Sequence, residues 1–419
     1  MDGTPGVSSA RRWSVVALLW VAFFLNYVDR QAIFSVFPSL RSDLGFTSAE
    51  LGLVGSIFLW CYSIWSLAAG RIADRFSRPQ LVCLCLVIWS GATLGTALST
   101  SVRMLLFWRG VMGLSESMYL PASMALIADL HTSKLQSTAL SLHQTAQMIG
   151  IIVGGWGGGW MADHFGWRSL FLVLAIAGIA YAPALWTGLR RFHAKSERVV
   201  RAKPWFGLLR SRCYLALACA FTAYCLMLWI LYSWFPLHLY ERFHISQGQS
   251  GLIATLTLQG STAAGVVLWG AASDRLARTT RLARFLVLGL GIAVSAPFAW
   301  WALSANSLAR VEAVSLLFGF FAGGLHANIA AAPFEVVPRE NRGMSIALLN
   351  LIGGMGGGAA ILLTGLYRQK LGISYLMRLC SITAIIGAAL MLLIVRKYLP
   401  LEFRRDNESQ TETLPVSEF

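Results

Sequence analysis

Two stretches of the sequence decide the fold: GRIADRFSR at residues 70–78 and GAASDRLAR at residues 270–278. They lie 200 residues apart. Four residues of the first copy recur in the second: Gly70, Asp74, Arg75 and Arg78 correspond to Gly270, Asp274, Arg275 and Arg278. Each copy follows the second of six apolar runs in its half of the chain. Such a repeat predicts two similar halves in the same orientation, related by a pseudo-twofold axis along the membrane normal, with a binding site between them.

The apolar runs are long enough to cross a bilayer. Hydrophobic residues make up 56% of the 419 residues and charged residues 13%, against about 45–50% and about 25% in soluble domains. We therefore exclude an ordinary soluble enzyme and predict an all-α polytopic membrane protein, with twelve transmembrane helices in two pseudo-symmetric six-helix bundles. The predicted spans are 13–38, 49–70, 80–100, 103–128, 136–160, 168–189, 213–238, 250–271, 284–304, 308–334, 344–366 and 375–395.

The net charge of +15 follows the same pattern. Of the 34 Lys and Arg residues, 24 flank the predicted spans on one side and eight on the other. The positive-inside rule explains this bias without a nucleic-acid partner and places both termini in the cytoplasm. We expect a monomer in the cell (inner) membrane, surrounded by lipid. The predicted parts are a cytoplasmic tail (1–12), a first bundle (13–189), a basic cytoplasmic linker (190–212), a second bundle (213–396) and a cytoplasmic tail (397–419).

Two spans carry charges inside their apolar runs. Span 1 contains NYVDR, in which Asn26, Asp29 and Arg30 share one helical face, and span 4 contains Arg109 and Glu116, which also share a face. An ionisable group costs at least about 2.5–3.5 kcal/mol at the bilayer centre, so these four need partners and a polar cavity. Alternatives are a static ion-pair cluster that joins the two helices, or Asp29 and Arg30 capping a shorter span.

The functional interpretation of these charges is proton coupling with anion binding. Burial favours a protonated carboxylic acid, whereas a neighbouring guanidinium favours the carboxylate, so movement of Arg30 or of substrate would switch Asp29 between the two forms. Glu116 can act in the same way. Arg30 can bind a substrate carboxylate or phosphate with its planar fork. Asn26 belongs to the same candidate binding site, and Arg109 is either a second anchor or a partner of Glu116.

Further polar residues lie within the other spans. Each could face a central cavity and contact substrate, or could form a hydrogen bond between helices. These candidate substrate-binding residues are Gln147 in span 5, Tyr224 and Tyr232 in span 7, Gln259 in span 8, His326 in span 10 and Asn350 in span 11.

Other kinds of site are not indicated. The glycine runs GGWGGG (154–159) and GGMGGG (353–358) have no following Lys-Ser/Thr, so they favour close helix packing over phosphate binding. Cys83 and Cys85 lack the second ligand pair of a metal site. Because no nucleophile–base pair stands out, we expect no enzyme activity, no metal and no cofactor.

The stretch at residues 70–78 resembles the signature G-x-x-x-D-R-x-G-R-[KR] of the major facilitator superfamily, although Ser77 and Pro79 replace the expected Gly and basic residue. The resemblance implies a transporter over residues 13–395. It also implies a conformational lock in which the charged residues bridge helix ends at the cytoplasmic face; alternatively, they only mark topology. The candidate lock residues are Gly70, Asp74, Arg75, Arg78 and Asp129 in the first half, and Gly270, Asp274, Arg275 and Arg278 in the second.

The pattern N-Y-x-D-R in span 1 with Glu116 in span 4 is similar to the anion:cation symporter branch, which includes sialin-like and sugar-acid transporters. That resemblance implies proton-coupled symport of a small organic anion by alternating access, with Asp29 and Glu116 as proton sites and Arg30 and Gln147 as substrate ligands. The spinster group, which carries lysolipids and sphingolipids, shares the same pattern. A transporter of a lysolipid, another amphiphile or a drug is therefore the alternative.

Overall fold

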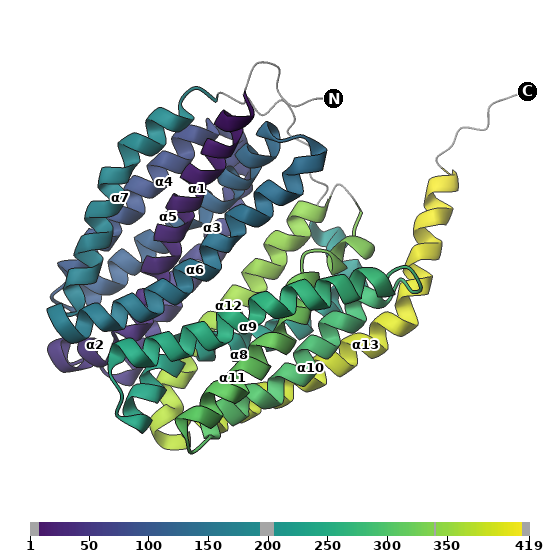
Figure 1. Cartoon of the computed structure of the whole chain (residues 1–419). Helices are drawn as coiled ribbons and strands as arrows, with labels where there is room; N and C mark the ends of the chain where they lie inside the picture. Colours follow the sequence, from purple (N-terminus) through teal and green to yellow (C-terminus); the bar gives the residue numbers. More distant parts are fainter. Residues whose placement is uncertain (1–7, 193–204, 339–340, 413–419) are drawn as a thin grey trace, which may run out of the picture.

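The computed structural model describes residues 8–192, 205–338 and 341–412, and it is almost entirely helical. Figure 1 shows two helical bundles, the first in purple to teal and the second in green to yellow. The first bundle contains α1 (Ser9–Ser35), α2 (Phe37–Leu44), α3 (Ser48–Arg75), α4 (Arg78–Ala97), α5 (Val102–Leu130), α6 (Ser133–Phe165) and α7 (Trp167–Leu189). The second contains α8 (Arg212–Phe243), α9 (Gln247–Leu276), α10 (Ala283–Ser304), α11 (Leu308–Asn328), α12 (Arg342–Leu371) and α13 (Ile373–Glu412), with short 3-10 turns η1 (Trp205–Arg210) and η2 (Ala332–Glu335).

The predicted twelve-helix architecture in two bundles is confirmed, with one local difference. Within the described residues, eleven helices are long and apolar enough to cross a membrane, and the remaining long helix is α6 with 33 residues. Polar side chains and glycines lower the hydropathy of α6. The first span is not continuous over 13–38, because α1 ends at Ser35 and the short α2 begins at Phe37 with a proline in its first turn. The last helix continues past residue 396 to Glu412.

The repeat is visible in the turns between helices. Gly166 (φ 81°) separates α6 from α7, and Gly372 (φ 79°) separates α12 from α13 at the equivalent point of the second half. Gly45 (φ 67°) ends α2, while His244 (φ 52°) ends α8. Positive φ favours glycine. In the described part of the chain, His244 is the only residue other than glycine that has a positive φ.

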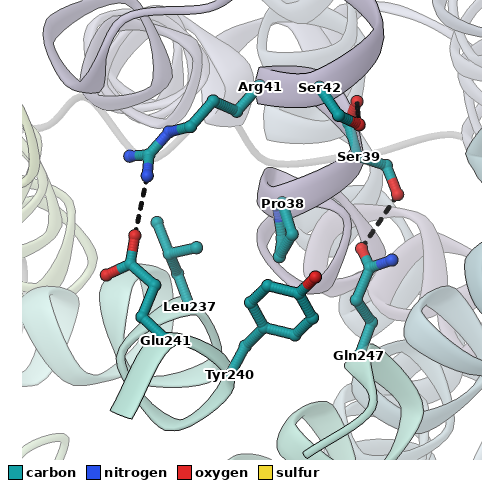
Figure 2. A pocket seen from close by; sticks show the side chains of 8 residues that line it. All are labelled: Pro38, Ser39, Arg41, Ser42, Leu237, Tyr240, Glu241 and Gln247. Atoms are coloured by element: carbon teal, nitrogen blue, oxygen red, sulfur yellow. Dashed lines mark hydrogen bonds and ion pairs between the residues drawn. The ribbon is translucent and has the colours of Figure 1, made fainter. Parts of the chain in front are cut away.

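The two bundles contact each other on one side of the molecule. In Figure 1 they meet near α2 and diverge towards the end where both chain termini lie. We call these ends the distal side and the terminus side. On the distal side α3 packs on α12 and α6 packs on α9. Ser39 of α2 also donates a hydrogen bond to Gln247 of α9 at 2.9 Å (Figure 2).

The first glycine run explains how α6 contacts two helices at once. Gly154 and Gly158 lie against α1, where a Cβ at Gly158 would be 3.1 Å from the Cα of Ala32. Gly155 and Gly159 lie against α9 of the other bundle, where a Cβ at Gly155 would be 2.9 Å from the carbonyl of Gly251. One pair therefore holds the first bundle together, and the other joins the bundles.

The second glycine run does the same in α12. Gly353 faces α8, where a Cβ would be 3.0 Å from Sγ of Cys225. Gly354 and Gly358 face Ser63 and Trp60 of α3 in the other bundle. The predicted role of these glycines in close packing is thus confirmed in both halves.

Candidate functional site

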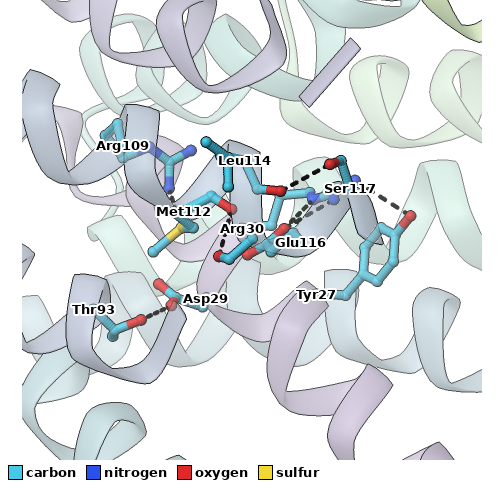
Figure 3. A network of polar contacts seen from close by, with 10 residues as sticks. Tyr27, Asp29, Arg30, Thr93, Arg109, Met112, Leu114, Glu116 and Ser117 are labelled. Carbon is cyan, nitrogen blue, oxygen red and sulfur yellow. Dashed lines mark hydrogen bonds and ion pairs between the residues drawn. The ribbon is translucent and has the colours of Figure 1, made fainter. Parts of the chain in front are cut away.

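Four ionisable side chains are buried together inside the first bundle. Asp29 and Arg30 come from α1, and Arg109 and Glu116 come from α5 (Figure 3). Their exposed fractions are 2%, 8%, 0% and 2%, respectively. Asn26 lies one turn before Arg30 on α1 and is also buried. We call the four ionisable residues the ionic cluster. The alternative in which Asp29 and Arg30 cap a shorter span is excluded, because α1 continues to Ser35.

Arg30 is held by one carboxylate and three aromatic rings. Its Nε and Nη2 donate to the same oxygen of Glu116, at 3.2 and 2.9 Å. Its guanidinium carbon lies 4.6 Å from the ring centres of Tyr27 and Tyr62 and 4.8 Å from that of Phe58. Such cation–π contacts stabilise a desolvated cation by about 2 kcal/mol. Sequence reasoning did not identify Phe58 and Tyr62 of α3 as residues of the site, because aromatic side chains are common in apolar spans.

Asp29 and Arg109 lie beside this pair without a direct salt bridge. The hydroxyl of Thr93 on α4 donates to one oxygen of Asp29. The guanidinium of Arg109 lies 4.6 Å from the centre of the Phe58 ring, and its Nη1 is 3.2 Å from Sδ of Met112. Phe58 therefore contacts both guanidinium groups of the cluster. Thr93 is a third site residue that sequence reasoning missed, because a threonine inside an apolar span is common.

Several buried polar atoms of the cluster have no hydrogen-bond partner. They are Oδ1 of Asp29, Oε1 of Glu116, and Nε and Nη2 of Arg109. Leaving a buried polar group unpaired costs about 1–3 kcal/mol, and more for a charged group. With both carboxylates ionised, the formal charges of the four residues sum to zero. An additional charge that enters the cluster can therefore be balanced by a bound counter-ion or, if it is negative, by the uptake of a proton.

Four of the candidate residues of the second bundle form two neutral pairs. The hydroxyl of Tyr224 lies 3.3 Å from Nε2 of His326, and Nε2 of Gln259 donates to the hydroxyl of Tyr232 at 2.6 Å. The backbone carbonyl of Tyr232 also accepts a hydrogen bond from Gln31 of α1, at 3.2 Å. This last bond connects the second bundle to the helix that carries Asp29 and Arg30.

Gln147 and Asn350 occupy equivalent helices but different environments. Gln147 of α6 is half-buried, whereas Asn350 of α12 is exposed. Among the residues that the structure describes, neither side chain has a hydrogen-bond partner. Both lie in the half of their helix nearer the terminus side, where the bundles diverge (Figure 1).

The two copies of the repeated stretch differ in their contacts. In the first, Arg78 forms an ion pair with Asp129 at the end of α5, and its Nη1 also donates to the carbonyl of Ala125 at 3.4 Å. The side chains of Asp74 and Arg75 lie outside the described part of the structure. A Cβ at Gly70 would meet open space, and one at Gly270 would lie 3.7 Å from Cβ of Ala327.

In the second copy the three charged side chains are exposed. None of them forms a salt bridge with another described residue. They are Asp274, Arg275 and Arg278.

Comparison with known proteins assigns the family. A family model described as Major Facilitator Superfamily matches residues 19–240 and 217–418. The chain is 27% identical to "Probable galactarate/D-glucarate transporter GudP" of Bacillus subtilis, over 99% of this chain and 98% of that protein. It is 28% identical to "Protein spinster homolog 1" of Bos taurus, over 71% of this chain and 61% of that protein.

A solved structure has the same fold. It is a bacterial homologue of the human lysosomal transporter Spinster, in an inward-facing and unoccupied conformation, with a TM-score of 0.83 and 18% sequence identity. The two chains match over 94% of this one and 99% of the other. Together with the two matched halves and the twelve long helices of the described residues, these findings show that the chain is a multi-pass membrane transporter, not an enzyme, and that it belongs to the major facilitator superfamily.

Proposed function

We propose that this protein is a secondary transporter that moves a small organic anion, such as a sugar acid or another carboxylate, together with protons by alternating access. The observation that carries the proposal is the buried ion pair between Arg30 and Glu116 inside a cluster whose four formal charges sum to zero. In this proposal Arg30 binds the anion, and Asp29 and Glu116 carry protons.

Charge balance is the physical reason for coupling. An anion that binds Arg30 competes with Glu116 for its one positive charge. The cluster would then carry an extra negative charge away from water, which is costly. Uptake of a proton by Glu116 or Asp29 restores neutrality. Anion and proton therefore bind with positive cooperativity, and each is released more easily once the other has left.

The substrate class follows from the cation of the first bundle and the neutral polar pairs of the second. A carboxylate matches the fork of Arg30, and the neutral pairs Tyr224–His326 and Tyr232–Gln259 supply hydrogen bonds of the kind that sugar hydroxyls accept and donate. Gln147 and Asn350 add two amides on the side where the bundles diverge. The likeness to a galactarate/D-glucarate transporter supports a polyhydroxylated acid.

The orientation in the membrane is part of the proposal. We infer that both termini are cytoplasmic and that the protein works as a monomer in the inner membrane. The terminus side is then cytoplasmic, and the contacts of the distal side close the site from outside. The ion pair between Arg78 and Asp129 belongs to the cytoplasmic lock, which favours one conformation over the other.

A second candidate is an amphiphile such as a lysolipid. The likeness to spinster homologues in sequence and in fold favours it. So do the rings of Tyr27, Phe58 and Tyr62, which give Arg30 an aromatic surrounding suited to a charged head group on an apolar tail.

The test is uptake into proteoliposomes with an imposed pH gradient. We expect the protein to concentrate D-glucarate when the outside is acidic, and we expect no uptake of a lysolipid. Asp29→Asn should abolish uphill uptake but preserve exchange of external for internal substrate, because the anion site remains while the proton carrier is lost.

Glu312→Gln of α11 is the matched control, since it makes a similar acid-to-amide change in a half-buried carboxylate far along the chain from the cluster. It should leave uphill uptake intact. Concentrative uptake that persists in Asp29→Asn would remove Asp29 as the proton carrier. Transport of lysolipid without D-glucarate would favour the second candidate.

A further inference from the structure

A cavity with polar and apolar lining residues lies on the distal side, away from the ionic cluster. It has a volume of about 220 Å³ and lies between α2 of the first bundle and α8 and α9 of the second (Figure 2). We call it the vestibule. The lining residues used below are Ser39, Arg41, Ser42, Tyr240, Glu241 and Gln247.

One carboxylate in the vestibule is shared by two arginines. Arg41 donates to Oε1 of Glu241 at 2.7 Å, and Arg368 of α12 pairs with the other oxygen. Arg41 is fixed within its own bundle, because its second terminal nitrogen donates to Ser48 at 3.0 Å. The side chains of Arg41 and Glu241 are 37% and 32% exposed, so solutes can reach them. Two guanidiniums on one carboxylate leave one positive charge in excess.

Two neighbouring acidic groups, Asp43 and Asp163, are hydrogen-bonded by neutral donors, and among the described residues neither forms an ion pair with Arg41 or Arg368. Asp43 accepts hydrogen bonds from Ser42 at 3.0 Å and from the Trp167 indole at 3.1 Å. Asp163 accepts the backbone N–H groups of Gln247 and Gly248 at the start of α9, at 3.2 and 2.8 Å. A further cation, Arg242, donates to Asn306 at 2.7 Å. In addition, Nη1 of Arg368 is buried without a hydrogen-bond partner.

The remaining lining groups suit a hydroxylated ligand. Ser39, Ser42, Tyr240 and Gln247 contribute three hydroxyls and an amide to the lining, and Figure 2 shows Ser39, Ser42 and Gln247 on the other side of the view from the Arg41–Glu241 pair. Pro38 and Leu237 are the apolar lining residues. The cavity therefore places several neutral hydrogen-bonding groups beside the trio Arg41, Glu241 and Arg368, whose own charges sum to one positive. That combination matches a small polyhydroxylated carboxylate.

We propose that the vestibule is a second, entry-side anion site, in which a substrate carboxylate replaces Glu241 at Arg41. Arg41 belongs to the first bundle and Glu241 to the second, so this exchange removes an ion pair that holds the bundles together. Arrival of the anion then favours opening of the distal side. The identity of the ligand rests on the proposed function, whereas the existence of an anion site at Arg41 does not.

Two variants of opposite charge test the site. We measure the concentration of D-glucarate that half-saturates uptake from the distal side. Arg41→Gln removes the cation and should raise that concentration about tenfold or more, because charge-assisted hydrogen bonds are lost. Glu241→Gln removes the competing carboxylate and should lower it. Both variants break the same ion pair between the bundles. If that pair only closed the distal side and bound no anion, the half-saturating concentration would change in the same direction in both variants. That result would overturn the proposal.

A binding readout is independent of transport. Ser42 is exposed and lines the vestibule, so Ser42→Cys can be labelled with a membrane-impermeant maleimide on intact cells. We expect D-glucarate, but not the uncharged sorbitol, to slow labelling, even in an Arg30→Gln background that disables the central site. The same protein without Ser42→Cys provides the blank, because the chain has seven native cysteines.

The outcomes distinguish a failure of the vestibule site from a failure of the proposed function. If wild-type protein transports D-glucarate but the anion gives no protection at Ser42→Cys, the vestibule site is wrong while the proposed function stands. If D-glucarate protects Ser42→Cys and Arg41→Gln abolishes this protection, the site is supported even when D-glucarate is not transported. Protection that is unchanged by Arg41→Gln would place the anion elsewhere and contradict the proposal.

Discussion

The two bundles share one architecture but distribute charge differently. Equivalent glycine runs pack α6 and α12 against both bundles, and equivalent glycines turn the chain at residues 166 and 372. The first bundle nevertheless buries the four ionisable side chains of the ionic cluster together, while the candidate residues of the second are neutral and include pairs such as Tyr224–His326. The repeat thus preserves helix packing and turn geometry, whereas the buried Asp, Glu and Arg side chains of the described residues lie in the first half. In the function that we propose, the first bundle therefore performs the proton chemistry and binds the anion at Arg30, and the second recognises neutral groups of the substrate.

The largest effect should come from breaking the buried pair of the first bundle. Arg30→Met leaves Glu116 charged and buried without a cation, which should cost about 3–5 kcal/mol of stability. Adding Glu116→Gln removes the unpaired charge and should recover most of the loss. Thermal unfolding of the purified variants measures both changes, and the double variant should still fail to bind the anion.

Equal destabilisation in the single and double variants would mean that Arg30 stabilises the fold through its aromatic contacts instead of through Glu116. In that case the charge-balance explanation of coupling would lose its basis, although the location of the cluster would be unaffected.

A smaller effect is expected in the second bundle. Tyr224→Phe removes one neutral hydrogen bond, worth about 0.5–1.5 kcal/mol, so substrate affinity should fall by about two- to tenfold. The dependence of uptake on the pH gradient should stay the same, because no charge is altered. Uptake kinetics at several pH values test this. A change in pH dependence would show that the second bundle also takes part in proton coupling.

The smallest effect should distinguish the two copies of the repeated stretch. Arg78→Gln breaks the ion pair with Asp129, whose side chain is 39% exposed, so the expected change is about 0.2–1 kcal/mol. That shifts the balance between conformations at most about fivefold. Distances between spin labels on the two bundles can report this balance. Arg278→Gln, at the exposed equivalent position, is the matched control and should have no effect.

The sequence by itself determined much of this protein. Apolar runs and the repeat at residues 70–78 and 270–278 predicted the helices and the two bundles, because hydropathy and periodicity are local properties of the chain. The same reasoning located the buried charges of α1 and α5, since an ionisable residue inside an apolar run stands out. It also placed glycine runs at helix contacts, although it could not say which contacts join the bundles.

Only the tertiary structure decided the partners. Arg30 meets Glu116, which is 86 residues away, and both arginines of the cluster meet Phe58. Thr93 reaches Asp29, and Glu241 is shared between Arg41 and Arg368. These contacts depend on how helices rotate and cross when they pack. A pattern along one helix shows which face is polar, but the group opposite that face is set by the packing of other helices.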